Sequence, residues 1–179
     1  MLPKRIPLTG TAGDDFFVRQ QDDYSCGPAS LATAANIYGA GIDYKTIRDI
    51  VNPDPAIGTA QEKIAEVAEK ILPFAAAGES TYKGGVAVAN IVQEGEGHYV
   101  VFLAREKDRV IYYEPYYHEL VIDDINNIEW HSGDGKFAKW AADRAPLDGN
   151  SIDFWLKYAE PKTPAPHAQK KATPKPPVP

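Results

Sequence analysis

Four residues of this chain carry the side chains that thiol chemistry requires: Cys26, His98, Glu114 and Gln20. Cys26 is the only cysteine among 179 residues, so it forms no internal disulfide, and as a thiolate it would be a nucleophile without any metal. Such a nucleophile needs a nearby base, a group that orients the base, and donors for the developing oxyanion. We assign His98 as the base, Glu114 as the orienting carboxylate, and Gln20 with the Cys26 backbone N–H as the oxyanion donors.

The sequence around Cys26 predicts a helix that begins at the thiol. Apolar residues from Leu31 to Ile37 follow at helical spacing, and Gly39 ends the run. The first turn of a helix presents unpaired N–H groups and the positive end of the helix dipole, which favour an anion. A thiolate at Cys26 would therefore be stabilised by its position in the chain.

Two further helices are predicted in the first half of the chain. Asp43, or the residue before it, caps a short helix that runs through Ile50. Thr59 is predicted to cap a third helix, because Glu62 completes a capping box and the following apolar residues repeat every three and four positions. Pro73 is the predicted end of this helix.

After residue 85 the apolar residues follow the period of strands, over 86–92, 98–103, 110–113 and 118–122. Short turns separate these runs, so we expect an antiparallel meander; a helical half before it makes an α+β fold. Because a short hairpin joins the strands of His98 and Glu114, the two side chains should be neighbours, with the imidazole facing Cys26. The run 16–19 is predicted to be a first strand that delivers Gln20.

The order and spacing of these residues resemble a known family. Gln20, then Cys26-Gly27-Pro28-Ala29-Ser30-Leu31, His98-Tyr99-Val100-Val101 and Glu114-Pro115, resemble the papain-like double-glycine leader peptidases, which process bacteriocins. The resemblance spans roughly residues 16–122 and includes Gly58-Thr59. It implies a free-standing papain-like cysteine peptidase with Cys26 as nucleophile, His98 as general base and acid, Glu114 as orienter and Gln20 in the oxyanion hole.

One residue departs from the family pattern, which usually has Asp-Pro where this chain has Glu114-Pro115. The charge is kept, but the side chain is one methylene longer. A strand or the imidazole ring must therefore shift to keep the hydrogen bond. No transporter segment follows in this sequence, so docking to an export channel is not implied.

The sequence predicts one domain with two flanking segments. Residues 1–15 are predicted to be an irregular lead-in, 16–159 the peptidase domain, and 160–179 a disordered tail in which seven of twenty residues are Pro. The part 123–159, which holds most of the bulky aromatic residues, is interpreted as turns and short elements that pack back on the sheet.

Charge and hydropathy restrict the classes of binding partner and the cellular location that the sequence predicts. Residues 1–159 have a net charge of −9 and residues 160–179 of +3, and an acidic body argues against nucleic acid. We find no secretory signal and no apolar run long enough to span a membrane. We therefore predict a cytoplasmic protein, with virion association or non-classical export as alternatives. No cofactor is predicted, and His118 and His131 lack a further metal ligand at a familiar spacing.

Several assignments stay open at this point. Gln21 is an alternative oxyanion donor to Gln20. The loop 22–23 is either solvated or selects a basic substrate. The tyrosines of 112–117 form either a half-buried aromatic face or the wall of a peptide groove.

Two functions from different classes fit the sequence. The first is a cysteine hydrolase that cleaves a peptide or isopeptide amide through an acyl-enzyme, with a transferase version in which an amine replaces water. The second is a catalytically weak or inactive papain-like domain that serves as a binding or structural module of a phage particle or secretion assembly, attached through residues 160–179. The Glu at position 114 and the Lys-Pro tail motivate the second function.

Overall fold

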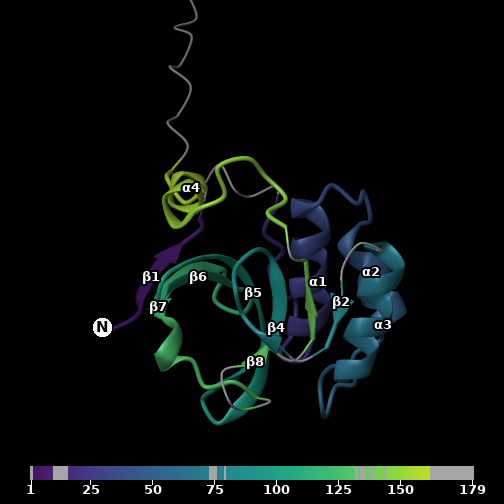
Figure 1. Cartoon of the computed structure of the whole chain (residues 1–179). Helices are drawn as coiled ribbons and strands as arrows, with labels where there is room; N and C mark the ends of the chain where they lie inside the picture. The colour runs from purple at the N-terminus through teal and green to yellow at the C-terminus, as the bar shows by residue number, and fades with distance from the viewer. Residues whose placement is uncertain are drawn as a thin grey trace, which may run out of the picture.

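The computed structural model describes residues 2–9, 16–72, 76–78, 80–131, 133, 136–137, 139–142 and 144–161. In these ranges three helices precede a meander of strands, and a fourth helix follows it (Figure 1). No helix in this part of the chain is long and apolar enough to cross a membrane. The predicted Pro-rich tail lies, from residue 162, outside the described residues.

Seven strands form one antiparallel sheet in the spatial order β1-β7-β6-β5-β4-β9-β2. They are β1 Lys4–Pro7, β2 Ala76–Ala77, β4 Ala87–Gln93, β5 Glu96–Glu106, β6 Arg109–Glu114, β7 Glu119–Asp124 and β9 Trp140–Ala141. The two short strands β3 Ser80–Thr81 and β8 Lys136–Phe137 pair with each other separately. Strands β4 to β7 are consecutive neighbours, which confirms the predicted meander.

The helices are α1 Cys26–Ile37, α2 Tyr44–Val51, α3 Gln61–Ile71 and α4 Ile152–Tyr158. Helix α1 lies between the sheet and the pair α2 and α3 (Figure 1). Asp43 caps α2 as predicted, since its Oδ1 accepts a hydrogen bond of 3.0 Å from the Thr46 N–H. The N-terminal helical half therefore packs on the C-terminal sheet, which confirms the predicted α+β fold.

The predicted first strand 16–19 is wrong. Side chains of α1 bind its backbone instead of another strand: the Val18 N–H donates to Thr33 Oγ1 at 2.9 Å, and Asn36 Nδ2 donates to the Phe16 carbonyl at 3.3 Å. These two bonds hold the segment against the helix. It still delivers Gln20 to the start of α1, as expected.

The predicted cap of the third helix is also wrong. Helix α3 begins at Gln61 after Ala60, with no side-chain cap, and Thr59 Oγ1 has no hydrogen-bond partner among the described residues. The Thr59 side chain instead presses against α1, because a Cβ atom at Gly27 would lie 2.7 Å from its Oγ1. Only glycine at position 27 allows this close approach of the loop to the beginning of α1.

The lead-in contains a strand where irregular structure was predicted. Lys4–Pro7 forms β1 at the edge of the sheet and pairs with β7. The Arg5 guanidinium donates to the Glu119 carboxylate across this pair. Residues 10–15 of the lead-in lie outside the described residues.

Two apolar cores cover the two faces of the sheet. The larger core lies between the sheet and α1 and includes Leu31 and Val101. The smaller core lies on the opposite face, where the rings of Phe102 and Trp130 stack with centroids 5.1 Å apart beside Tyr82. Residues from Tyr99 to Leu103 of β5 enter the two cores alternately, so this strand is a continuous apolar run in the sequence.

The C-terminal part contains α4 in addition to the predicted short elements, which are η2 Ile125–Asn127, β8 and β9. Ser151 caps α4 by accepting a hydrogen bond of 3.0 Å from the Phe154 N–H. The buried ring of Trp155 contacts the rings of Phe16 and Phe17 at centroid distances of 6.2 and 5.8 Å. Helix α4 therefore covers the segment that leads into Gln20.

Helix α1 is buried on nearly all sides, with eleven of its twelve residues buried. One turn after Cys26, Ser30 Oγ donates a buried hydrogen bond of 3.1 Å to the Tyr99 carbonyl of β5. This bond joins the helix that begins with the thiol to the strand that carries His98. The bond fixes the position of α1 along the length of β5.

The substitution Ser30→Ala tests this connection. It leaves the Tyr99 carbonyl buried without its donor, so we expect the free energy of unfolding to fall by about 1–3 kcal/mol. Urea unfolding followed by circular dichroism measures the change. Ser80→Ala, at an exposed position of β3, is the control and should change it by less than about 0.5 kcal/mol. Equal losses in the two variants would contradict the assigned role of Ser30.

Candidate active site

Cys26 is the first residue of α1, directly after Ser25, as the sequence predicts. It is 7% exposed, and together with Gln20 and His98 it lines a cleft of about 880 Å³. The N–H groups of the first helical turn have no acceptor within the helix and carry its positive end. The thiol therefore lies where a groove gives access to it and where an anion is favoured.

His98 and Glu114 meet as the predicted hairpin requires. Nε2 of the ring hydrogen bonds Glu114 Oε1, and the Cys26 side chain also hydrogen bonds the ring. Glu114 is fully buried and accepts further bonds from the N–H groups of Tyr116 at 2.9 Å and Tyr117 at 2.7 Å. The extra methylene of Glu114 is thus accommodated without loss of the contact with His98.

His98 and Glu114 each favour the charged form of the other. Burial disfavours a charged His98 ring, but its hydrogen bonds with Cys26 and Glu114 outweigh this and raise its pKa to about 9. Burial likewise opposes the Glu114 carboxylate, yet the bonds from His98 and from the Tyr117 and Tyr116 N–H groups lower its pKa. These hydrogen bonds therefore favour an imidazolium beside the Glu114 carboxylate.

Gln20 lies in the same cleft and is held from two sides. Its backbone N–H donates to the Pro115 carbonyl at 3.1 Å, and its side-chain Nε2 donates to the Asp22 carbonyl at 2.6 Å. Nε2 carries a second proton, which that bond does not use. Gln21 is exposed and does not line the cleft, so Gln20 is the glutamine next to the thiol.

Exposed apolar side chains from two segments line the cleft. Ile57, which is 83% exposed, belongs to the loop closed by the bridge between Asp54 and Gly58. Tyr116 and Tyr117, which are about half exposed, come from the turn after β6. The sequence allowed two interpretations of the tyrosines. Tyr116 and Tyr117 form part of the wall of the groove, whereas Tyr112 and Tyr113 are buried in the two cores.

The two aspartates before Cys26 differ in their surroundings. Asp22 is partly buried, but hydrogen bonds from Arg48 at 2.8 Å and from the Tyr24 N–H at 3.2 Å outweigh that burial and lower the pKa of Asp22. Asp23 is exposed and lines the cleft. The first therefore stabilises the loop, and the second faces any bound ligand.

Comparison with known proteins identifies the family. The family model described as the peptidase C39 family matches residues 15–126. The chain belongs to the peptidase C39 family. The predicted resemblance and the papain-like fold are therefore confirmed. Helix α4 lies beyond the matched residues of this C39 chain.

Two solved structures share the fold of this C39 chain. The peptidase domain of Streptococcus ComA, a bi-functional ABC transporter involved in a quorum sensing pathway, is 21% identical with a TM-score of 0.56, covering 72% of this chain and 98% of that chain. A double glycine motif protease from an AMS/PCAT transporter, solved with the leader peptide, is 17% identical with a TM-score of 0.51. The match covers 76% of this chain and 94% of that chain. No curated protein matches the chain.

Sequence reasoning missed two polar residues of the cleft. Asn90 lies in β4 opposite Tyr99, with Oδ1 buried. His131 Nδ1 is 3.2 Å from Gln61 Nε2 and bridges the sheet to α3. A polar residue within the apolar run 86–92 was the available signal for Asn90. Nothing local pointed to His131, because its partner is seventy residues away.

The pKa values predict how stability depends on pH. The pKa of His98 lies above its ordinary value of 6.5, so its stabilising contribution is complete below pH 6.5 and is lost as the pH rises through about 9. The lowered pKa of Glu114 gives a contribution that is complete above 4.5 and is lost as the pH falls through that lowered value. Urea unfolding across this range, with NMR titration of the ring, measures both.

The variant Glu114→Gln separates the two contributions. We expect the pKa of His98 to fall and the loss of stability between pH 6.5 and 9 to flatten. Glu69→Gln, at an exposed position of α3, should leave the titration unchanged. A His98 titration that is the same in Glu114→Gln as in the wild type would refute the assigned coupling.

Proposed function

We propose that this C39 chain is a cysteine peptidase that cleaves a peptide or isopeptide amide with Cys26, His98, Glu114 and Gln20. The observation that carries the proposal is that His98 hydrogen bonds both Cys26 and the buried Glu114 carboxylate at the wall of an open cleft. This is the arrangement that activates a thiol: a base next to the nucleophile and a group that orients the base.

In the first half of the reaction the Cys26 thiolate attacks the carbonyl carbon of the substrate. An S–C bond forms, and the electron pair of the C=O bond moves to the oxygen. The free proton of Gln20 Nε2 and the Cys26 N–H would donate to this oxyanion. When the C–N bond breaks, His98 gives its proton to the leaving amine, and an acyl-enzyme thioester remains.

In the second half His98 is neutral and takes a proton from water, which then attacks the thioester carbonyl. The S–C bond breaks, the acid product leaves, and the thiolate with its charged imidazole is restored. Glu114 holds the ring in the same orientation throughout, because its second oxygen is anchored by the N–H of Tyr117. An amine in place of water would give the transferase version.

The shape of the cleft supports an extended peptide as substrate. Exposed apolar side chains are uncommon on the described surface, and Ile57, Tyr116 and Tyr117 all stand at this groove. The leader peptide bound to the AMS/PCAT protease is of the same chemical class. A peptide with a double-glycine site is therefore the first substrate to test.

Alkylation tests the pairing of thiol and imidazole. Since Cys26 is the only cysteine, iodoacetamide labelling reports on it alone. We expect rapid stoichiometric labelling at pH 6 in the wild type and at least a roughly tenfold slower rate in His98→Ala. His131→Ala, which removes another histidine of the cleft, is the matched control and should label like the wild type. Slow labelling that His98→Ala leaves unchanged would count against the thiolate.

Hydrolysis of a peptide library tests the oxyanion donor. We expect wild-type cleavage, no cleavage by Cys26→Ala, and a fall in kcat of about 10²–10³-fold with little change in KM for Gln20→Ala. Gln21→Ala replaces the exposed neighbour and should keep wild-type kcat. A larger loss in Gln21→Ala than in Gln20→Ala would reverse the assignment, and an inert wild type would refute the proposed function.

A further inference from the structure

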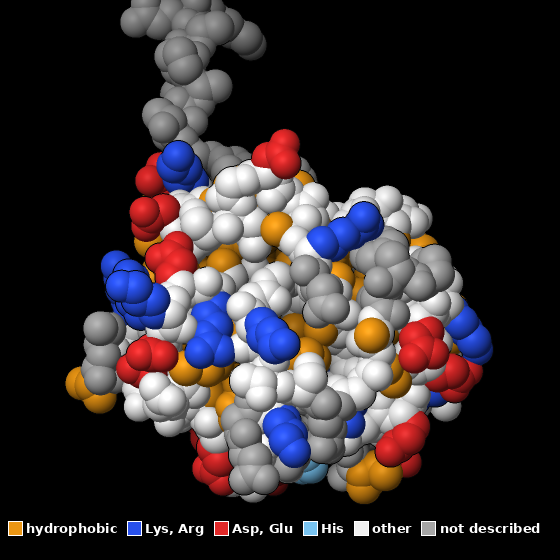
Figure 2. Space-filling model, viewed as in Figure 1, with side chains coloured by type: hydrophobic (Ala, Val, Ile, Leu, Met, Phe, Trp, Pro, Cys, Tyr) orange, Lys and Arg blue, Asp and Glu red, His pale blue; other side chains and the backbone are white. Residues whose placement is uncertain are grey.

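Apart from the pair Cys26 and His98, the charged side chains among the described residues that line the cleft are all carboxylates. The exposed carboxylates Asp23, Glu94 and Glu96 line it, and no Lys or Arg is among the described residues that do so. A cleft lined by one sign of charge focuses the electrostatic field and concentrates ligands of the opposite sign. The face drawn in Figure 2 differs, since Lys and Arg side chains occupy its middle.

Asn90 gives independent evidence of a ligand in the same cleft. The residue is 6% exposed and lines the cleft, and no described residue donates a hydrogen bond to its Oδ1. The amide does hydrogen bond the Tyr99 hydroxyl on the neighbouring strand, so the side chain is held in place. A fixed, buried acceptor without a donor is destabilising until a donor reaches it.

The position of Asn90 places this acceptor beside the catalytic strand. A Cβ atom at Gly97 would lie only 3.1 Å from Asn90 Oδ1, and Gly97 directly precedes His98. The acceptor is therefore next to the part of β5 that carries the proposed base. A ligand group bound here would be part of the substrate near the bond that is cleaved.

We propose that this cleft selects peptides that carry Lys or Arg near the cleaved bond, which adds a substrate preference to the proposed function and rests on it. Ammonium and guanidinium groups carry only donors and a positive charge. They match the three exposed carboxylates Asp23, Glu94 and Glu96 and the buried acceptor Asn90. The rings of Tyr116 and Tyr117 offer apolar surface to the aliphatic stems.

Binding to the inactive variant Cys26→Ala tests the preference without hydrolysis. The probes are three dansylated decapeptides of Ala and Gly that differ only in bearing several Lys, Gln or Glu residues. We expect the Lys peptide to bind roughly tenfold more tightly than the Gln peptide and the Glu peptide to bind most weakly, with the differences shrinking as salt is added. Equal affinities for the three peptides would overturn the inference.

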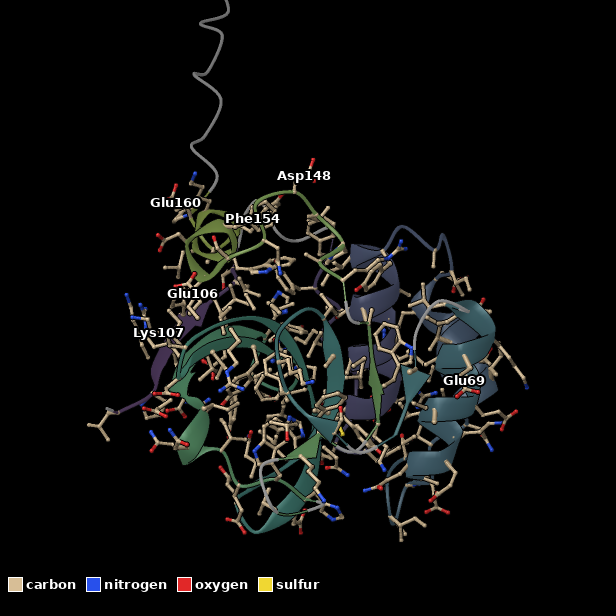
Figure 3. The ribbon with its side chains drawn as sticks, in the orientation of Figure 1. Glu69, Glu106, Lys107, Asp148, Phe154 and Glu160 are labelled. Atoms are coloured by element: carbon tan, nitrogen blue, oxygen red, sulfur yellow. The ribbon has the colours of Figure 1, made fainter. Side chains whose placement is uncertain are left out.

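A matched pair of triple variants in the Cys26→Ala background locates the effect. Asp23→Asn with Glu94→Gln and Glu96→Gln should remove the Lys preference. The control replaces Glu69, Asp148 and Glu160 in the same way, which changes the net charge equally; these exposed side chains lie away from the cleft, two of them near α4 (Figure 3). An equal loss of preference in the control would attribute the effect to net charge and overturn the inference.

Asn90→Leu tests the buried acceptor, and thermal unfolding checks that the variant folds. Weaker binding of the Lys peptide, with the affinity for the Gln peptide retained, supports the role of Asn90, and unchanged binding of the Lys peptide overturns it.

The peptidase proposal is judged separately. A wild type that binds the Lys peptide selectively but cleaves nothing would refute the peptidase and keep the preference for Lys. A wild type that cleaves peptides with and without Lys equally well would keep the peptidase and refute the preference.

Discussion

The site depends on one constraint, the fixed position of α1 against β5. Thiol and imidazole come from positions 26 and 98 of the chain. The hydrogen bond from Ser30 Oγ to the Tyr99 carbonyl joins the two elements one helical turn from Cys26 and one residue from His98. Small residues make this contact possible, since α1 is rich in Ala and Gly27 admits the Thr59 side chain. The close packing of the helix is therefore a condition for the chemistry, because a larger separation would break the contact between sulfur and ring.

The turn that follows β6 connects the remaining groups. Its N–H groups at Tyr116 and Tyr117 bind the buried Glu114 carboxylate, and its Pro115 carbonyl accepts from the Gln20 backbone. A buried carboxylate is costly unless donors surround it, and here His98 and two backbone groups do so. The same turn therefore keeps Glu114 ionised and places Gln20 beside the thiol. A longer side chain at position 114 is compatible with this arrangement because the N–H groups of the turn after β6 reach both of its oxygens.

The sequence was sufficient where local patterns decide the structure. The helices after Cys26 and Asp43, the meander of β4 to β7, and the contact of His98 with Glu114 all follow from apolar period, caps and hairpin length. The errors occur where distant contacts override local signals. Segment 16–19 has strand composition but binds α1 side chains, and Thr59 packs against Gly27 instead of capping α3. No local pattern reports such contacts.

The same distinction applies to the C-terminal part, which the family model does not cover. The short apolar pattern of α4 is weak, yet Trp155 packs on Phe17, whose ring lies 4.8 Å from that of Tyr113, the neighbour of Glu114. Phe17 also leads directly into the segment that carries Gln20. Aromatic contacts thus connect α4 to both the carboxylate strand and the proposed oxyanion donor. Helix α4 therefore packs against elements that position the proposed site, although it lies outside the residues matched by the family model.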